Sequence, residues 1–393
     1  MKYDANQSLY LNKLWNSVEG RSILTYTIRE LAEEAIAPTY FPTAFTINPN
    51  PVPTDASGKA SFTVTAKSPE HSTMADLIAP LGEGRPAEEG QEQSYSGSIA
   101  DFLAPTWSET TPERKYKQDL FAELGDDAPL LQGFATDVLA PRIKSLYMSL
   151  DFMALRAETT GRVFYDKGAG NKAAIYKADI PAENFHKAGA KAWTDPDCRL
   201  LDQMVKIEQE YVDLWGVNFS RQWKVTKDMF KNVIMKNAQV IDTIKMNWLL
   251  DKGIATDSTS SVSNFVITEE NFNKYVVAAI DGLSPIRVID AKQMDNGQVV
   301  DPWEPGIAVL CPAGMAGEIL RTNLLETQMY DKDMLNNAVS INWSTTANGL
   351  ITVFNYVQPS GLFKTFYSKC RMSAVPVLQD WLFRVLVQTT KAE

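Results

Sequence analysis

One long helical pattern, from Asp127 to Gly161, constrains this chain more than any other stretch of its sequence. Apolar residues recur three or four positions apart and so share one helix face: Leu131, Phe134, Val138, Ile143, Leu146, Leu150 and Met153. At about 1.5 Å per residue the helix would measure roughly 50 Å. An ordinary helix has about 12 residues. The pattern therefore predicts a flat, elongated subunit built along one helix.

Two residues mark the interior and the end of this helix. Pro141 interrupts the pattern and predicts a bend, because proline lacks a backbone donor and crowds the preceding turn. Gly161 follows the last apolar position, where a left-handed cap costs least.

The bulk composition bounds the class of protein. A chain of 393 residues exceeds what one core usually supports, so we expect two or more lobes. Hydrophobic residues make up 45% and charged residues 22%, as in folded soluble proteins. No apolar run approaches the ~20 residues of a membrane span, and the N-terminus lacks the features of a signal peptide. Cys198, Cys311 and Cys370 are too far apart in sequence to indicate a disulfide framework or a metal site, which favours a reducing, cytosolic origin.

The formal net charge of −10 argues against tight binding to nucleic acid, which requires a basic surface. A surface that only encloses nucleic acid would tolerate this sign, because repulsion would keep the polymer mobile.

The N-terminal segment, residues 9–37, is amphipathic. Trp15 belongs to one apolar face, and Leu24, Ile28, Leu31 and Ile36 form another. We expect an arm that docks on a neighbouring subunit; the alternative is a helix packed on its own domain. Five prolines follow within residues 38–58, which predicts an extended linker without regular structure.

A projecting hairpin is predicted after the linker. Residues 61–67 (SFTVTAK) alternate as a strand does, and residues 75–81 and 99–103 are apolar and strand-like. Between the latter two pieces lies an acidic segment, residues 82–98, which we expect to be its mobile tip. An isolated hairpin is marginal in water, so the hairpin should lie on another subunit. Its predicted inter-subunit contact residues, together with Trp15, are Glu83, Arg85, Glu88 and Glu89.

Helices and strands alternate between residues 185 and 345, which predicts a compact α/β lobe. Residues 162–180 read as a hairpin, and residues 191–216 as a helix capped by Asp195. Asp295-Asn296-Gly297 is a strong hairpin-turn signal. The strands expected at 349–357 and 371–388 should return the chain to the long helix.

No catalytic signature is found. The two histidines are isolated, and no nucleophile elbow, HExxH motif or paired-cysteine spacing is present. Asp195 and Asp197 suggest a metal site, but a helix cap explains them better. Residues 168–172 (GAGNK) resemble a phosphate loop without completing the motif. The nine scattered tryptophans fit core packing better than base stacking. We therefore expect no enzyme activity, no cofactor and no bound metal.

What the sequence offers instead is a long helix, a projecting hairpin, an arm and a compact lobe. Segments that cannot be stable alone gain their burial from neighbours, as in obligate assemblies with interfaces of roughly 2,000–5,000 Å². The chain is therefore predicted to be a subunit that assembles with copies of itself.

The order of these parts also resembles a known family. The relevant stretches are SFTVTAK and GSIADFLAP around GEGRPAEEG, ALRAETTGRVFYDKGAG, AKAWTDPDCRLLDQM, IRVIDAKQMDNGQVVDPWEPGIAVLCPAG and SAVPVLQDWLFRVLVQ. In this order they are similar to the major capsid proteins of tailed bacteriophages with the Hong Kong 97 fold, of the lambda type (phage major capsid protein E). The resemblance runs from about residue 59 to the C-terminus.

The resemblance implies an α+β fold with four parts. They are an N-terminal arm (1–55), an extended E-loop hairpin (56–110), a peripheral domain (111–184 and 346–393) with the spine helix (127–161), and an α/β axial domain (185–345). It further implies self-assembly into hexamers and pentamers of an icosahedral virion shell that encloses double-stranded DNA without sequence-specific binding. Scaffold, portal and possible decoration proteins would be partners, and assembly would take place in the bacterial cytoplasm, with no membrane.

Three points stay open at this stage. Some members of this fold join a hairpin lysine to an asparagine, which here would be Lys67 with Asn336 or Asn337. Maturation would move the lobes against a spine helix that bends at Pro141. The alternative to a phage shell is an encapsulin-like cellular compartment, which has the same fold.

Overall fold

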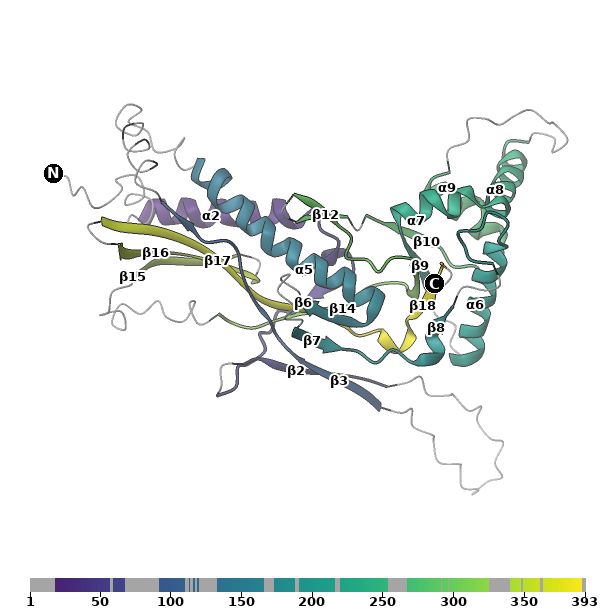
Figure 1. Ribbon diagram of the computed structural model, residues 1–393, viewed down its shortest axis with the longest axis horizontal. Helices are drawn as coiled ribbons and strands as arrows, with labels where there is room; N and C mark the ends of the chain where they lie inside the picture. Colours follow the sequence, from purple (N-terminus) through teal and green to yellow (C-terminus); the bar gives the residue numbers. More distant parts are fainter. Residues whose placement is uncertain are drawn as a thin grey trace, which may run out of the picture. The chain divides into compact units, whose positions relative to one another are not determined.

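Within the computed structural model, the described residues are 18–56, 59–67, 92–109, 113, 116, 119, 133–165, 173–187, 191–215, 220–253, 267–290, 292–295, 297–324, 340–347, 349–360 and 363–390. They form two compact units (Figure 1). Unit 1 comprises Met1–Phe62, Ser98–Met153 and Ile319–Pro376, and unit 2 comprises Thr63–Gly97, Ala154–Glu318 and Val377–Glu393.

The long helix predicted from the sequence is present, and it has two parts. A π-helical stretch, η2 (Phe134–Leu139), leads directly into α5 (Ala140–Thr160). The Ala140 N–H donates to the carbonyl of Ala135, five residues earlier. Gly161 follows with φ of +63°, which confirms the left-handed cap. Residues 127–132 lie outside the described residues.

The sheet of unit 1 has the strand order β1-β14-β17-β16-β15, with β4 and β5 also pairing with β17. Its strands are β1 (Phe45–Ile47), β4 (Asp101–Leu103), β5 (Trp107–Ser108), β14 (Gly317–Arg321), β15 (Ser340–Ala347), β16 (Ile351–Ser360) and β17 (Phe363–Leu378). β16 and β17 form a long antiparallel pair, from Ile351 opposite Met372 to Ser360 opposite Phe363. The strand-rich C-terminal region expected near the long helix is therefore largely found in unit 1.

Helix α2 (Val18–Ile36) packs on unit 1 itself. Leu24, Ile28 and Ala32 are fully buried, four residues apart, whereas Leu31 and Ile36 are only half-buried. Residues 18–36 thus follow the alternative interpretation of the N-terminal segment, a helix on its own domain. Trp15 lies outside the described residues, so docking of an arm on a neighbour stays a prediction.

The extended linker expected at residues 38–58 is wrong in part. η1 (Phe41–Thr43) is a 3₁₀ turn and β1 pairs with β14. Phe41 and Phe45 are buried, and burial of their rings offsets the cost of ordering the segment. Pro42 sits in the first turn of η1, where its missing N–H has no helical role.

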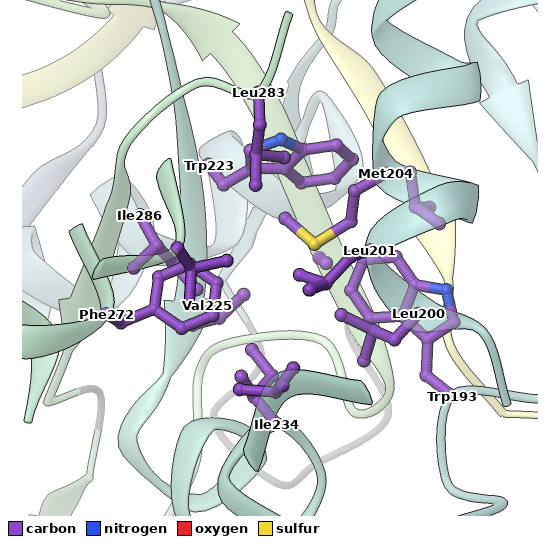
Figure 2. Close-up of a cluster of buried hydrophobic side chains, with 14 of the residues drawn as sticks. Trp193, Leu200, Leu201, Met204, Trp223, Val225, Ile234, Phe272, Leu283 and Ile286 are labelled. Carbon is purple, nitrogen blue, oxygen red and sulfur yellow. The ribbon is translucent and has the colours of Figure 1, made fainter. Parts of the chain in front are cut away.

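Unit 2 contains the α/β lobe. Its mixed sheet has the order β10-β9-β13-β18-β8, formed by β8 (Phe185–His186), β9 (Arg221–Thr226), β10 (Ile286–Ile289), β13 (Ile307–Pro312) and β18 (Val385–Gln388). The turns and helices that accompany it are η3 (Ala182–Asn184), α6 (Leu200–Trp215), α7 (Lys227–Asn232), η4 (Ile234–Lys236), α8 (Ala238–Asp251), α9 (Glu269–Tyr275), η5 (Val277–Ala279) and η6 (Trp381–Phe383). Figure 2 shows part of the core between them, including Trp193, Met204, Trp223 and Phe272.

The last strand of the chain belongs to this lobe, whereas the sequence placed all of residues 346–393 in the domain of the long helix. β18 pairs with β13 on one side and β8 on the other. Val385, Leu386 and Val387 are all buried. A strand that is apolar at consecutive positions needs cover on both faces, and a central place in the sheet provides it. The predicted four-domain division stays a prediction otherwise.

Two smaller elements complete unit 2. The hairpin of β11 (Gln293–Asp295) and β12 (Gln298–Val300) confirms the predicted turn, with Gly297 at φ of +79°. β6 (Arg162–Tyr165) and β7 (Ala173–Lys177) are antiparallel, as predicted for residues 162–180.

The projecting hairpin begins with β2 (Ser61–Lys67), which matches the predicted strand, and returns through β3 (Glu92–Ser98). The sheet order is β2-β3-β7-β6. The prediction that all of residues 82–98 form a mobile tip is therefore wrong for residues 92–98. Tyr95 explains the difference, because it is buried and fixes β3 in place. Residues 68–91, including the predicted strand 75–81, lie outside the described residues.

Candidate functional site

Four charged side chains are buried together in unit 2. Glu158 comes from α5, Lys224 from β9, and Asp380 and Arg384 flank η6. Lys224 Nζ lies 2.7 Å and Arg384 Nη1 3.0 Å from Glu158 Oε2. Arg384 also donates to both carboxylate oxygens of Asp380, at 3.0 and 2.7 Å from Nη2. The cluster holds two cations and two anions, so it is neutral as a whole.

The electrostatics of this cluster indicate a structural role. Burial raises the pKa of Asp380, although Arg384 opposes the shift. Burial also acts to lower the pKa of Arg384, but Asp380 and Glu158 outweigh it and the pKa rises. Shifted ionisable groups often mark active sites. Here each charge already has a buried partner, so no group is left to act on a substrate.

A second buried carboxylate, Glu208 of α6, is fully occupied by hydrogen bonds. It accepts from Trp223 Nε1 and from the Ser284 backbone N–H, both at 2.7 Å, and from the Ser284 hydroxyl. These contacts tie α6 to β9 and to the segment before β10. Trp223 is fully buried, as are Trp193, Trp303 and Trp381, so core packing is confirmed for these four tryptophans.

The proposed alternatives of metal or nucleotide binding gain no support. Asp195 does not cap α6, which begins at Leu200; its carboxylate instead accepts from the Asp197 N–H at 3.0 Å within a turn. The helix starts later because Asn237 and Gln239 side chains bind Cys198 O and Leu201 N. Among the described residues, no group of three or more His, Cys, Asp or Glu side chains is placed to hold a metal ion.

Residues 166–172, which contain the incomplete phosphate-loop motif, lie outside the described part of the chain. In the described part, no helix is both long and apolar enough to cross a membrane.

The surface of unit 2 has features that bear on contact with other chains. One edge of the five-stranded sheet, β10, is closed by side chains of α9. Asn273 accepts from the Ile286 N–H at 2.8 Å and donates to the Ile286 carbonyl at 2.9 Å. Glu269 accepts from the Val288 N–H at 3.1 Å. These side chains take the place of a further strand, so another chain cannot pair with this edge.

Several large apolar side chains are exposed on unit 2. Met246 and Leu250 lie one turn apart on α8, Phe185 lies on β8, and Met294 and Val299 face each other across the β11–β12 hairpin. Single exposed apolar residues are normal, but pairs on one face indicate contact surfaces. These exposed side chains are therefore candidate contact surfaces.

The base of the projecting hairpin is anchored in unit 2. The Tyr95 hydroxyl donates to the Leu378 carbonyl at 2.6 Å, and its ring stacks on Tyr176 at 5.0 Å and meets the edge of Trp381 at 4.8 Å. The hairpin thus starts from a fixed point, while β2 forms one edge of its four-stranded sheet.

The predicted contact residues Trp15, Glu83, Arg85, Glu88 and Glu89 all lie outside the described residues, so their role in contacts stays a prediction. Asn336, Asn337 and the side chain of Lys67 also lie outside what the structure describes, so the cross-link hypothesis stays a prediction.

Pro141 is exposed in the first turn of α5, directly after the π-helical stretch. Arg142 next to it donates to the carbonyls of Val138 and Pro105. A π-helical insertion before proline is a local irregularity of the predicted kind. The bend itself stays a prediction.

The sequence interpretation missed the buried charge cluster and the closed sheet edge. The spacing of Asp380 and Arg384 was the one available signal, since residues four apart meet on a turn of chain. Glu158 and Lys224 are 66 residues apart in sequence, and no local pattern relates them.

A comparison with solved structures identifies the fold. The chain is similar to a protein assigned as the capsid protein of a prophage in Escherichia coli CFT073, with 15% identity, coverage of 94% of this chain and 98% of that chain, and a TM-score of 0.53. No protein-family model matches the sequence, and the search of curated proteins found no match.

Two further structures are similar at lower scores. They are a phage-related protein from Bordetella bronchiseptica RB50 (11% identity, 92% and 96% of the two chains, TM-score 0.43) and the mature capsid of bacteriophage PhiM1 (11%, 90% and 88%, 0.39). The conclusion rests on the first comparison: this chain has an α+β capsid-protein fold, as the sequence resemblance implied.

Proposed function

We propose that this chain is the major capsid protein of a tailed bacteriophage, which assembles into hexamers and pentamers of a closed icosahedral shell. The observation that carries the proposal is the fold, which corresponds to that of the prophage capsid protein over nearly the whole of both chains. A match confined to one lobe would leave the remaining domain free for another activity.

Three features of the chain support the proposal. Its buried ionisable clusters are internally neutralised, so they serve stability. Its exposed apolar pairs and anchored hairpin provide surfaces for other copies. Its net charge of −10 suits a container of double-stranded DNA that does not grip the polymer. We infer no enzyme activity and no cofactor.

The proposal extends to partners and place. We propose a scaffold protein, a portal protein and a decoration protein as partners in assembly. Assembly would occur in the host bacterial cytoplasm and the product would be the virion head.

The direct test is electron microscopy and sedimentation of the purified full-length chain, alone and with its scaffold. We expect rings of six and five subunits and closed shells. A chain that stays monomeric at all concentrations under both conditions would exclude the proposal. If shells formed but those isolated from the native host held a cargo enzyme instead of DNA, the encapsulin-like alternative would be correct.

A further inference from the structure

The two edges of the five-stranded sheet in unit 2 differ. β10 is closed by Asn273 and Glu269 of α9. β8, at the opposite edge, pairs only with β18 among the strands that the structure describes. Phe185 of β8 is 53% exposed, although a phenylalanine on a sheet edge gains most when it is covered. In the described part of the chain the β8 edge therefore presents Phe185, whereas His186 beside it lies 3.5 Å from a carboxylate oxygen of Glu210.

Beside the closed edge lies a second apolar surface, on the C-terminal half of α8. Met246 is 55% exposed and Leu250 61% exposed, one helical turn apart. This half of α8 is held against α9, because Asn247 donates to the Tyr275 carbonyl at 2.7 Å and Asp251 accepts from the Tyr275 hydroxyl at 3.0 Å. Met246 and Leu250 are thus presented on a fixed support.

The two surfaces cannot meet within one copy. Five strands separate the sheet edges by about 19 Å, at roughly 4.8 Å per strand. In Figure 1, α8 and α9 lie at the upper right of unit 2 and β8 at its lower right. We propose that Phe185 of one copy packs against Met246 and Leu250 of the next copy, which makes a head-to-tail contact between unit 2 of neighbouring subunits. This inference rests on the proposed function.

Charge accompanies each apolar surface in a complementary way. Lys187 follows Phe185 by two residues, directly after the end of β8, and is exposed. Asp242 precedes Met246 by one turn of α8 and is exposed, about 6 Å along the helix. Neither has an ion-pair partner in the described part of the chain. The two charges are opposite in sign, so Lys187 of one copy would face Asp242 of the next.

The size of the contact fits a ring and not an isolated dimer. Three side chains that are half exposed offer about 300 Å² of apolar surface. A stable pair of proteins needs about 1,200 Å² or more in total. A head-to-tail contact repeats around a closed ring, so many weak copies act together. We therefore expect no dimer of this type in dilute solution.

The test uses full-length chains that carry Phe185→Cys or Leu250→Cys, treated with a short bismaleimide after assembly. The three native cysteines are buried and give a low background. We expect neither variant to cross-link alone, an equal mixture to yield dimers, and the double variant to yield a ladder of covalent oligomers. Dimers from either single variant alone would mean a symmetric contact and overturn the proposal, as would particles without any cross-link in the mixture.

Charge reversal provides an independent test. Lys187→Glu and Asp242→Lys should each lower the yield of assembled particles about tenfold, and the double reversal should restore it. Phe185→Ser should lower the yield similarly, whereas Met315→Ser, which changes a side chain 54% exposed between β13 and β14, should not. Loss in the double reversal equal to the sum of the single losses would contradict the pairing. If the unaltered chain formed no assemblies, the proposed function itself would fail.

Discussion

Replacing Arg384 by methionine should destabilise unit 2 more than any loss of a surface charge. Arg384 is fully buried, and its guanidinium is the buried partner that both oxygens of Asp380 bind. Methionine fills much of the same volume without the charge. The variant therefore isolates what happens when Asp380 keeps its charge and loses its partner.

The expected magnitude follows from the geometry. Glu158 retains Lys224 at 2.7 Å, so only Asp380 is left unpaired. Breaking a buried ion pair on one side costs about 3–5 kcal/mol. This corresponds to at least a ~100-fold change in the unfolding equilibrium, at 1.4 kcal/mol per tenfold. Adding Asp380→Asn to the variant removes the orphan charge and should recover part of the loss.

The loss should also depend on pH. Burial already raises the pKa of Asp380 in the folded chain, and removal of Arg384 raises it further. The folded state of the variant then binds a proton that the unfolded chain has released. Its destabilisation relative to the parent is therefore smallest near and below the ordinary pKa of a carboxyl group, about 4. It grows as pH rises through the raised pKa.

The assay is urea unfolding followed by tryptophan fluorescence, because Trp193, Trp223, Trp303 and Trp381 are all buried in unit 2. Arg199→Met is the matched control: its ion pair with Asp202, at 2.6 Å, is largely exposed, and such pairs contribute ~1 kcal/mol or less. If Arg384→Met shifted the transition no more than this control, the account of the buried cluster would be wrong.

Four further outcomes are expected. Gly317→Ala places a methyl group 1.9 Å from the backbone carbonyl oxygen of Val377 and should prevent the native fold. Gly133→Ala meets nothing within 4 Å and should raise the melting temperature slightly. Soluble Gly317→Ala protein with native circular dichroism would contradict this account. Asn273→Ala uncovers the backbone of β10 and should cost about 1–3 kcal/mol and promote aggregation, measured by light scattering. Unchanged stability without added scattering would show that Asn273 does not protect this edge. Tyr95→Phe removes one hydrogen bond at the hairpin base and should cost about 0.5–1.5 kcal/mol, with faster hydrogen exchange in β3 as its signature. Burial raises the pKa of Cys370 to about 12, so its thiol stays protonated at pH 8. The thiol should therefore react with a disulfide reagent only after denaturation. Rapid labelling of the native chain would show that Cys370 is not buried.

Local patterns predicted the elements whose signals lie within a few residues. The long helix and its Gly161 cap, the strand 61–67 and the 295–297 turn all follow from side-chain period or from a residue that tolerates positive φ. Thr226 caps α7 by accepting from the Met229 N–H at 3.2 Å, for the same local reason. Where the sequence erred, as at residues 38–58 and 92–98, polar or proline-rich composition concealed the buried rings of Phe41, Phe45 and Tyr95.

The sequence by itself determined many of the helices and strands and, through the order of its motifs, indicated the α+β capsid-protein fold. The tertiary structure alone decided that Glu158 meets Lys224 and Arg384, that β18 completes the lobe, and that side chains of α9 close one sheet edge. The physical reason is the distance along the sequence over which each interaction acts. Hydrogen bonds within a turn and side-chain periodicity involve residues only a few positions apart. The partner of a buried charge or of a strand edge comes from whichever distant segment the packing brings next to it.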